Sequence, residues 1–277
     1  DRYFAVDVEA VDGDLKKEGP VGHGKAICWS IYCGDDVDFG NGPRVWIDNL
    51  DAETDLLKEF VPFLSNEEYK KVWHNYGFDR HIIYNHNVDV KGFGGDTLHM
   101  ARLWNASRRG VGAYSLEQLS LELLPEDKQT KTSMKTRFGR RRKKKDGSLA
   151  KAIIVPELEL LQRDPEWICE WIDYSTLDSQ VTWHLREQLE LHLRAAVWQE
   201  EEKTNLFDFY EQIWRPFGEL LTDMERRGIM VDVPLLKQLI PIATEDKKKA
   251  EKKFIDWACK RCPDAKYMNP GSDAQKQ

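Results

Sequence analysis

Three β-rich runs precede the first strong helical pattern in this 277-residue sequence, and that order restricts the fold more than any other feature. The runs lie at Tyr3–Val8, Ala26–Cys33 and Val45–Ile47, with glycine- and proline-containing turns between them. A helical pattern over Asp55–Leu64 follows, and it leads to another short apolar run at Lys71–His74. Strands first, and then strands alternating with helices, predict an α/β layer fold built on a mixed sheet.

The remaining sequence is predicted to be mostly helical. We expect Asp79 to open one helix and Asp96 to cap the next, after a loop at Gly92–Gly95. Long helices are predicted from Pro165 onward and over Phe207–Arg227, because their apolar residues recur at helical spacing.

Composition excludes several classes of protein. A hydrophobic fraction of 41% with ten Trp residues excludes a disordered chain. No apolar run approaches the ~20 residues that a membrane helix requires, so we expect no membrane partner. The five cysteines have no framework spacing, which favours a reducing compartment. The chain opens in Asp1-Arg2-Tyr3, without the regions of a signal peptide and as if a strand were already under way, so we expect a fragment.

Two carboxylates lie two residues apart on the first β-rich run. Side chains at this separation on a strand project to the same face, so Asp7 and Glu9 repel each other there. Burial increases the repulsion, because it removes the water that screens the charges. We therefore expect the pair either at a solvent-exposed strand end or bridged by a cation, and the motif alone does not decide between the two.

Two later motifs are ambiguous by themselves. Asn75-Tyr76-Gly77-Phe78-Asp79 follows a predicted strand, and an Asp in such a place often caps a helix. Tyr174 and Asp178 share one helix face, but an amphipathic helix also tolerates a polar pair. In combination the motifs give four acids in order, with no competing His or Cys cluster. Such oxygens suit Mg²⁺ or Mn²⁺, and two of these ions about 3.5–4 Å apart clamp the oxygens of a phosphoryl transfer.

The order D-x-E, N-x-x-x-D and Y-x-x-x-D resembles the three exonuclease motifs of the DEDD superfamily, Tyr subtype. The resemblance implies a ribonuclease H-like fold and a 3′–5′ exonuclease that uses two Mg²⁺ or Mn²⁺ ions. It implies that Asp7, Glu9 and Asp178 hold the first ion. Asp7 would also bridge to the second ion, which Asp79 would support. The His subtype is disfavoured, because Asp173 stands five residues before the last Asp, where that subtype has His.

Further residues are assigned to the substrate. By the same resemblance, Tyr174 orients the attacking water and Asn75 lines the substrate groove. The aromatic rings of Tyr76 and Phe78 are candidates for stacking on unpaired bases, although we expect at least one aromatic of this segment to lie in the core. Family members often have Thr between the first two acids, where this chain has Val8, whose side chain we expect to point away from the metals.

The C-terminal part narrows the resemblance to family A DNA polymerases. Glu225–Asp232 resembles the E-R-x-G-(I/V)-x-(I/V)-D segment that opens their polymerase domain. Asn269–Ser272 together with Gln275 resembles the N-x-x-S-x-x-Q of their thumb. Val72–Tyr76 and Asp96–Trp104 resemble the plant and protist organellar branch.

This resemblance implies two domains and one activity. Residues 1–200 would be a proofreading exonuclease, and residues 201–277 the helical start of a truncated thumb, with the boundary inside Glu200–Asn205. The substrate would be the 3′ end of single-stranded DNA on a primer-template, in a mitochondrion or plastid. The palm, the fingers and the targeting segment are absent from this chain. Two alternatives stay open: a free-standing exoribonuclease of the same superfamily, which should lack Glu225–Asp232, and a non-catalytic nucleic-acid-binding module, whose acids would hold no metal.

One basic segment interrupts an otherwise acidic chain. Lys135–Lys145 holds eight basic residues and no acidic one, whereas the whole chain has a net charge of −7. The surrounding Thr130–Lys151 has almost no apolar residues, so we expect a mobile surface insertion. Its tract could be a nuclear-import signal, a nucleic-acid arm or a solvated loop. We favour a loop that contacts phosphates through Arg140, Arg141 and Arg142.

Overall fold

The computed structural model describes residues 2–11, 15–51, 55–125, 128, 131–143 and 149–276. The side chains of residues 15, 16, 142, 143, 149, 150 and 276 are outside this description as well. The chain divides into one compact unit that ends at Arg227 and a second that begins at Gly228. The first unit therefore runs past Glu200–Asn205, and the assignment of residues 201–227 to a polymerase thumb stays a prediction.

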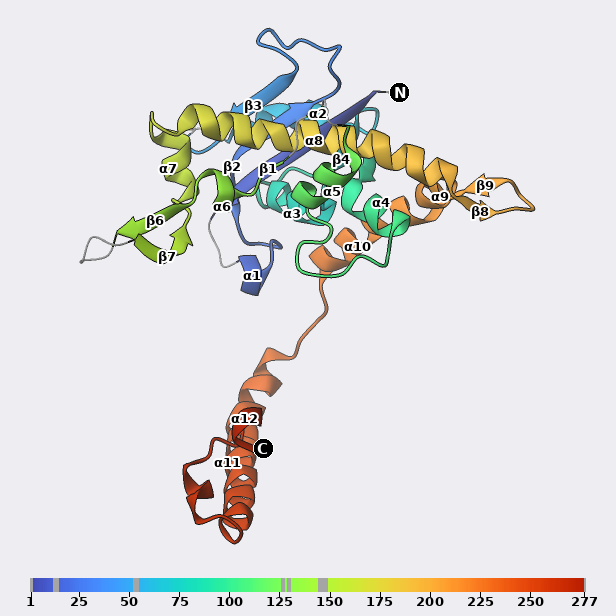
Figure 1. The fold of residues 1–277 in the computed structure, drawn as a ribbon. Coiled ribbons are helices and arrows are strands. Elements are labelled where there is room, and N and C mark those ends of the chain that lie inside the picture. The colour runs from blue at the N-terminus through green and yellow to red at the C-terminus, as the bar shows by residue number, and fades with distance from the viewer. Residues whose placement is uncertain are drawn as a thin grey trace. The chain divides into compact units, whose positions relative to one another are not determined.

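A five-stranded mixed sheet in the order β3-β2-β1-β4-β5 forms the centre of the first unit (Figure 1). Strand β1 (Tyr3–Val11) pairs antiparallel with β2 (Lys25–Tyr32), and β2 pairs antiparallel with β3 (Arg44–Asp48). On its other side β1 pairs parallel with β4 (Lys70–Trp73), which pairs parallel with β5 (Phe93–Asp96). The predicted α/β fold with a mixed sheet is confirmed.

Helices surround this sheet and complete the first unit. In chain order they and the remaining short elements are α1 (Leu15–Glu18), the 3₁₀ helix η1 (Leu56–Phe60), α2 (Val61–Leu64), α3 (Tyr76–Asn85), α4 (Thr97–Trp104), α5 (Leu116–Leu123), α6 (Met134–Arg137), β6 (Arg140–Lys143), β7 (Leu149–Ile154), α7 (Leu158–Arg163), α8 (Ile168–Ala195), β8 (Val197–Gln199), β9 (Thr204–Asn205), α9 (Leu206–Phe209), the π-helix η2 (Tyr210–Trp214) and α10 (Arg215–Arg227). The second unit consists of α11 (Val233–Cys259), the 3₁₀ helix η3 (Pro263–Tyr267) and α12 (Asp273–Lys276).

Both faces of the sheet are covered, which explains why every residue of β2 after Lys25 is buried. Trp29 and Ile31 belong to the core cluster that includes Ile82 and Ile83 of α3. Ser30, between them, points to the other face, where its hydroxyl donates to Ser179 of α8 at 3.0 Å. Alternate side chains of β2 therefore enter two different layers, one that packs against α3 and one that packs against α8.

The loop predicted at Gly92–Gly95 is wrong, because residues 93–96 form the edge strand β5. A Cβ on Gly94 would stand 3.0 Å from the Cβ of Lys70 on the neighbouring strand. The strand is glycine-rich because β4 approaches it this closely, and glycine removes the side-chain alternation that identifies strands in a sequence.

Helix α3 begins at Tyr76, three residues before the predicted start at Asp79. The earlier start depends on Asp96, whose buried carboxylate accepts the N–H of Asn75 at 3.0 Å and that of Tyr76 at 2.8 Å. Asp96 also accepts the N–H of Leu98 at 2.8 Å, so the cap predicted for the following helix is confirmed. One carboxylate therefore holds the starts of two helices.

The basic insertion, for which we expected a mobile surface segment, contains regular structure. Residues 134–137 form α6, and β6 and β7 pair as an antiparallel hairpin. Lys131 and Phe138 are buried, at 5% and 0% exposure, so the insertion also contributes to the interior. Lys144 and Lys145 lie outside the described residues.

The second unit is helical, with Asp232 capping α11 through the N–H of Leu235 at 3.0 Å. Near the end of this unit, the N–H of Asn269 donates to Oε1 of Gln275 at 2.8 Å. Among the residues that the structure describes, no helix combines the length and the apolarity needed to cross a membrane.

Candidate metal centre and active site

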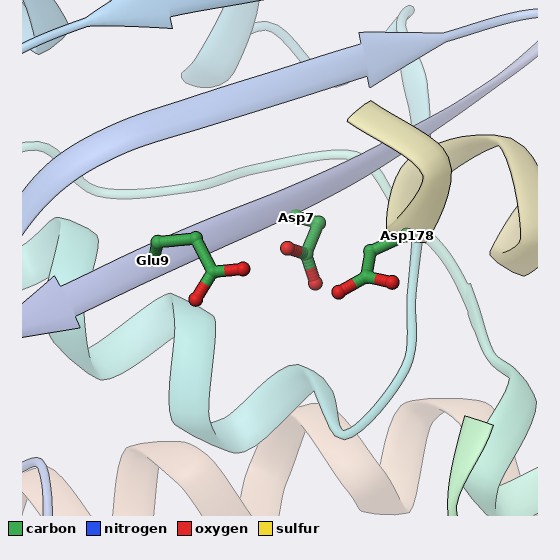
Figure 2. A group of neighbouring side chains, drawn as sticks. All are labelled: Asp7, Glu9 and Asp178. Atoms are coloured by element: carbon green, nitrogen blue, oxygen red, sulfur yellow. The ribbon is translucent and has the colours of Figure 1, made fainter. Parts of the chain in front are cut away.

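Three of the four predicted acids converge on one point. Asp7, Glu9 and Asp178 each place a carboxylate oxygen within 4.8 Å of the others (Figure 2). Strand β1 presents Asp7 and Glu9 on one face, because Val6 and Val8 between and beside them are buried on the opposite face. Helix α8 crosses this face and supplies Asp178. A strand and a helix, whose acids lie more than 160 positions apart in the sequence, thus form one acidic centre.

The fourth acid, Asp79, reaches the same stretch of β1 from the first turn of α3. Its Oδ1 accepts the N–H of Val8 at 3.0 Å, and the residue is 4% exposed. The pairing of β1 with β4 ends at Ala5 and Val72, so the Val8 N–H lies beyond the end of β4. Asp79 satisfies this buried donor, and the bond ties α3 to the residue between the two acids of β1.

Burial and mutual repulsion disfavour four ionised acids here. Burial is the main cause that raises the pKa of Asp7, followed by the charges of Asp178 and Asp79. Burial, with Asp178 next, raises the pKa of Glu9 to about 7, and burial also raises the pKa values of Asp79 and Asp178. Carboxylates in such a place are stabilised by a cation. Their hard oxygens fit Mg²⁺ or Mn²⁺ better than they fit softer metals.

Lys131 brings a positive charge to this centre, and the sequence analysis missed it. Its side chain is 6% exposed, and its ammonium forms an ion pair with Asp178 and lies 3.0 Å from the centre of the Tyr174 ring. The Lys131 backbone is held by Ser120 of α5, whose hydroxyl accepts its N–H at 3.1 Å. The charge of Lys131 lowers the pKa values of Asp7, Glu9 and Asp178, against the effect of burial. In the sequence, Lys131 is only one of many lysines within the basic insertion, so no local pattern distinguishes it.

Tyr174 lies one helical turn before Asp178 and is 6% exposed. Its ring packs against Phe138 at 5.3 Å and Trp171 at 5.9 Å between ring centres, while Lys131 covers it. Burial, and then the charges of Asp178, Glu9 and Asp7, raise the pKa of its hydroxyl. The hydroxyl therefore stays protonated and close enough to the acids to sense their charge.

Asp173, at the position that the His subtype reserves for histidine, has a different role. Its carboxylate is held by Nη2 of Arg44 at 3.0 Å and by Nη2 of Arg137 at 2.6 Å. Burial is the largest single cause and raises the pKa of Asp173. The hydrogen bonds and charges of Arg137 and Arg44 together outweigh burial, so the pKa is lowered.

The predicted substrate residues separate into two groups. Asn75 is exposed and adopts a left-handed conformation (φ 74°) just before α3, and Phe78 is half-buried. Tyr76 is fully buried, and its ring stacks on Phe93 with ring centres 3.9 Å apart. The prediction that Tyr76 stacks on bases is therefore corrected: its ring fills the core between α3 and β5, where no base reaches it.

The basic residues of the insertion lie on the hairpin β6–β7. Arg140 has a 64% exposed side chain that lies 4.5 Å from the Trp167 ring centre and 3.7 Å from a Glu166 oxygen. Arg141 is exposed, and the Arg142 side chain lies outside the described residues. Phe138, two residues before the hairpin, contacts the Tyr174 ring, so the hairpin is anchored next to the acidic centre.

Known proteins resemble this chain in sequence and in fold. Residues 1–194 match the model of the 3′–5′ exonuclease family found in DNA polymerase A. The chain is 46% identical to DNA polymerase I A, chloroplastic, of Oryza sativa subsp. japonica, over 98% of the chain and 27% of that protein. It is 45% identical to DNA polymerase I A, chloroplastic/mitochondrial, of Arabidopsis thaliana, over 97% of the chain and 27% of that protein.

The chain thus spans 27% of the length of these two relatives. A solved structure, the POL domain of Pol1 from M. smegmatis in complex with DNA primer-template and dNTP, matches with a TM-score of 0.58 and 16% identity. The match covers 91% of this chain and 33% of that one, and it supports the fold.

Proposed function

We propose, since the chain belongs to the 3′–5′ exonuclease family of family A DNA polymerases, that it removes nucleotides from the 3′ end of single-stranded DNA with the help of divalent metal ions. The observation that carries this proposal is the convergence of Asp7, Glu9 and Asp178, with Asp79 bound to the amide between the first two. A binding module without catalysis has no need for four acids whose pKa values burial raises.

The acids, Tyr174 and Asn75 would each have a separate role in this reaction. Asp7, Glu9 and Asp178 would hold one ion, and Asp7 and Asp79 the second. When bound, the ions would supply the positive charge that activates the attacking water and neutralises the scissile phosphate. The protonated hydroxyl of Tyr174 would orient that water, and exposed Asn75 would line the groove for the terminal nucleotide.

Proofreading in an organelle is the biological role that we propose. The relatives named above are chloroplastic or mitochondrial DNA polymerases, and we extend that location to this chain. The Glu225–Asp232 segment supports a polymerase origin over a free-standing exoribonuclease, because only a polymerase needs a segment that opens a polymerase domain.

Digestion of matched oligonucleotides tests the activity. We expect the chain to shorten a 5′-labelled single-stranded DNA from its 3′ end in MgCl₂ or MnCl₂, and to stop when EDTA is added. An RNA of the same sequence should be shortened more slowly. Faster digestion of the RNA would favour the exoribonuclease, and binding without digestion in either metal would favour the non-catalytic module.

The exposed arginines of the hairpin should contribute to DNA binding through phosphates. Replacing Arg140 and Arg141 together with Ala should weaken binding of single-stranded DNA and reduce the slope of log K against log salt by about 1.4, because two counterion-releasing contacts are lost. Arg194→Ala is the matched control, since Arg194 is a half-exposed arginine paired with Glu190 at the far end of α8. An unchanged slope in the double variant would mean that the arginines are only solvated.

A further inference from the structure

Arg80, the residue after Asp79, carries a charge that the proposed chemistry does not use. Its side chain is 2% exposed, and a buried guanidinium is strongly destabilising unless its hydrogen bonds are satisfied. Its partners come mainly from α10. Nη1 donates to the carbonyl oxygen of Glu219 at 3.1 Å and to the hydroxyl of Thr222, and Nη2 lies 2.9 Å from Oδ1 of Asp223.

Neighbouring contacts also join α3 to α10. Nε2 of His81 lies 2.7 Å from Oε2 of Glu225, and Arg226 donates to the Arg80 carbonyl oxygen at 3.0 Å. The backbones approach closely, since a Cβ on Gly77 would stand 3.3 Å from the methyl carbon of Thr222. Thr222 is 4% exposed, so this contact is dry.

Two residues near the start of α10 bond to β5, which carries Asp96, the residue that caps α3. The hydroxyl of Tyr210 accepts the N–H of Asp96 at 2.7 Å, and Asp96 in turn caps the start of α3. Arg215 donates to the carbonyl oxygen of Phe93 in β5 at 2.8 Å. Residues 206–227 therefore hold α3 both at its start and along its first turns.

We propose that Leu206–Arg227, which the sequence resemblance divides from the exonuclease, is a positioning element of the nuclease centre, and that Arg80 is the positioning residue through which it acts. By fixing α3, the segment keeps the Asp79 carboxylate against the Val8 amide and so sets the distance from Asp79 to the acids of β1. This inference rests on the proposed function for the role of Asp79, but the effect of α10 on the bond between Asp79 and Val8 is measurable without any nuclease activity.

The test substitutes α10 rather than the buried arginine, because Arg80 variants carry a risk of misfolding. Thr222→Val combined with Asp223→Asn removes the hydroxyl and the charge that Arg80 contacts. Val has nearly the shape of Thr, and Asn keeps an oxygen acceptor at the 55% exposed position 223, so we expect this variant to fold. Thr222→Ser keeps the hydroxyl and serves as the conservative variant. Thr244→Val combined with Asp246→Asn makes the same chemical changes at exposed positions of α11.

Two readouts report on Asp79 directly. Hydrogen exchange of the Val8 amide should accelerate about tenfold in the Thr222→Val, Asp223→Asn variant, while the amides of β2 keep their wild-type rates. Titration with Mn²⁺, followed by electron paramagnetic resonance, should show the weaker of two ions bound about tenfold less tightly. Turnover of DNA should fall through kcat, with KM unchanged. Thr222→Ser and the α11 control should match wild type in every readout.

Other outcomes separate the hypotheses. Unchanged Val8 exchange and Mn²⁺ affinity in the folded variant would overturn the positioning role, and so would a uniform increase in exchange over the whole sheet, which indicates a general loss of stability. If the wild-type chain digests no DNA while Val8 exchange still responds to α10, the proposed function fails and the positioning contact stands.

Discussion

Asp7→Asn is expected to lower the metal-dependent removal of 3′-terminal nucleotides by about a thousandfold or more. Asp7 lies between Glu9 and Asp178 in the acidic centre (Figure 2). The charge of Asp79 also raises the pKa of Asp7, and in the proposed mechanism Asp7 is the one acid shared by both ions. Asn keeps the shape of the side chain but loses the charge. Single-turnover digestion of labelled DNA in saturating Mg²⁺ measures the effect, with Asp246→Asn on α11 as the matched control.

The same substitution should stabilise the metal-free chain. In the folded state the pKa of Asp7 is raised, and that of Glu9 is raised to about 7, above their unfolded values. The folded state therefore binds more protons than the unfolded state between about pH 4 and pH 7, and stability falls as the pH rises through this range. Asn does not ionise, so at pH 8 in EDTA the variant should melt roughly 3–6 °C above wild type, equivalent to about 1–2 kcal/mol.

The two effects together distinguish a catalytic loss from a damaged fold. The stabilisation should vanish near pH 4, where wild-type Asp7 is protonated, and saturating Mg²⁺ should reverse it by stabilising wild type alone. Undiminished digestion by Asp7→Asn would refute the nuclease assignment. A lost activity accompanied by a lower melting temperature would instead make Asp7 a structural residue.

Lys131→Met is expected to have the opposite effect on stability. The substitution keeps an unbranched apolar stem but removes the ammonium that pairs with Asp178 and lies on the Tyr174 ring. Without metal, the acids then lose a buried counter-charge, which should cost about 2 kcal/mol, or roughly 4–8 °C in melting temperature at pH 8. Saturating Mg²⁺ should restore most of the loss, because the ions supply the missing positive charge.

Catalysis should also suffer, because Lys131 positions the Tyr174 ring. We expect kcat to fall about tenfold to a hundredfold with little change in KM for DNA. Lys128→Met is the matched control. Lys128 lies three residues before Lys131 and pairs with Asp35 on the surface. A Lys131→Met chain with wild-type stability in EDTA would show that the ammonium does not compensate the acids.

Much of the fold was predictable because local patterns carried it. The apolar alternation of β1 placed Asp7 and Glu9 on one strand face, and the structure has both on the face that α8 crosses. The cap at Asp96 depends on a side chain and an amide two residues apart, so the sequence was enough to predict it. Strand β5 escaped prediction because two of its four residues are glycines, which show no alternation.

The sequence by itself determined the family, the mixed sheet and the identity of the acids, because motif order, residue type and periodicity are properties of a linear chain. Only the tertiary structure decided that Lys131 lies on the Tyr174 ring, that Tyr76 is in the core, and that α10 holds α3 through Arg80. The contact between Lys131 and Tyr174 joins residues 43 positions apart, and the contact between Arg80 and Glu219 of α10 joins residues 139 positions apart. Packing between whole helices and strands brings them together, and no spacing within a short window encodes it.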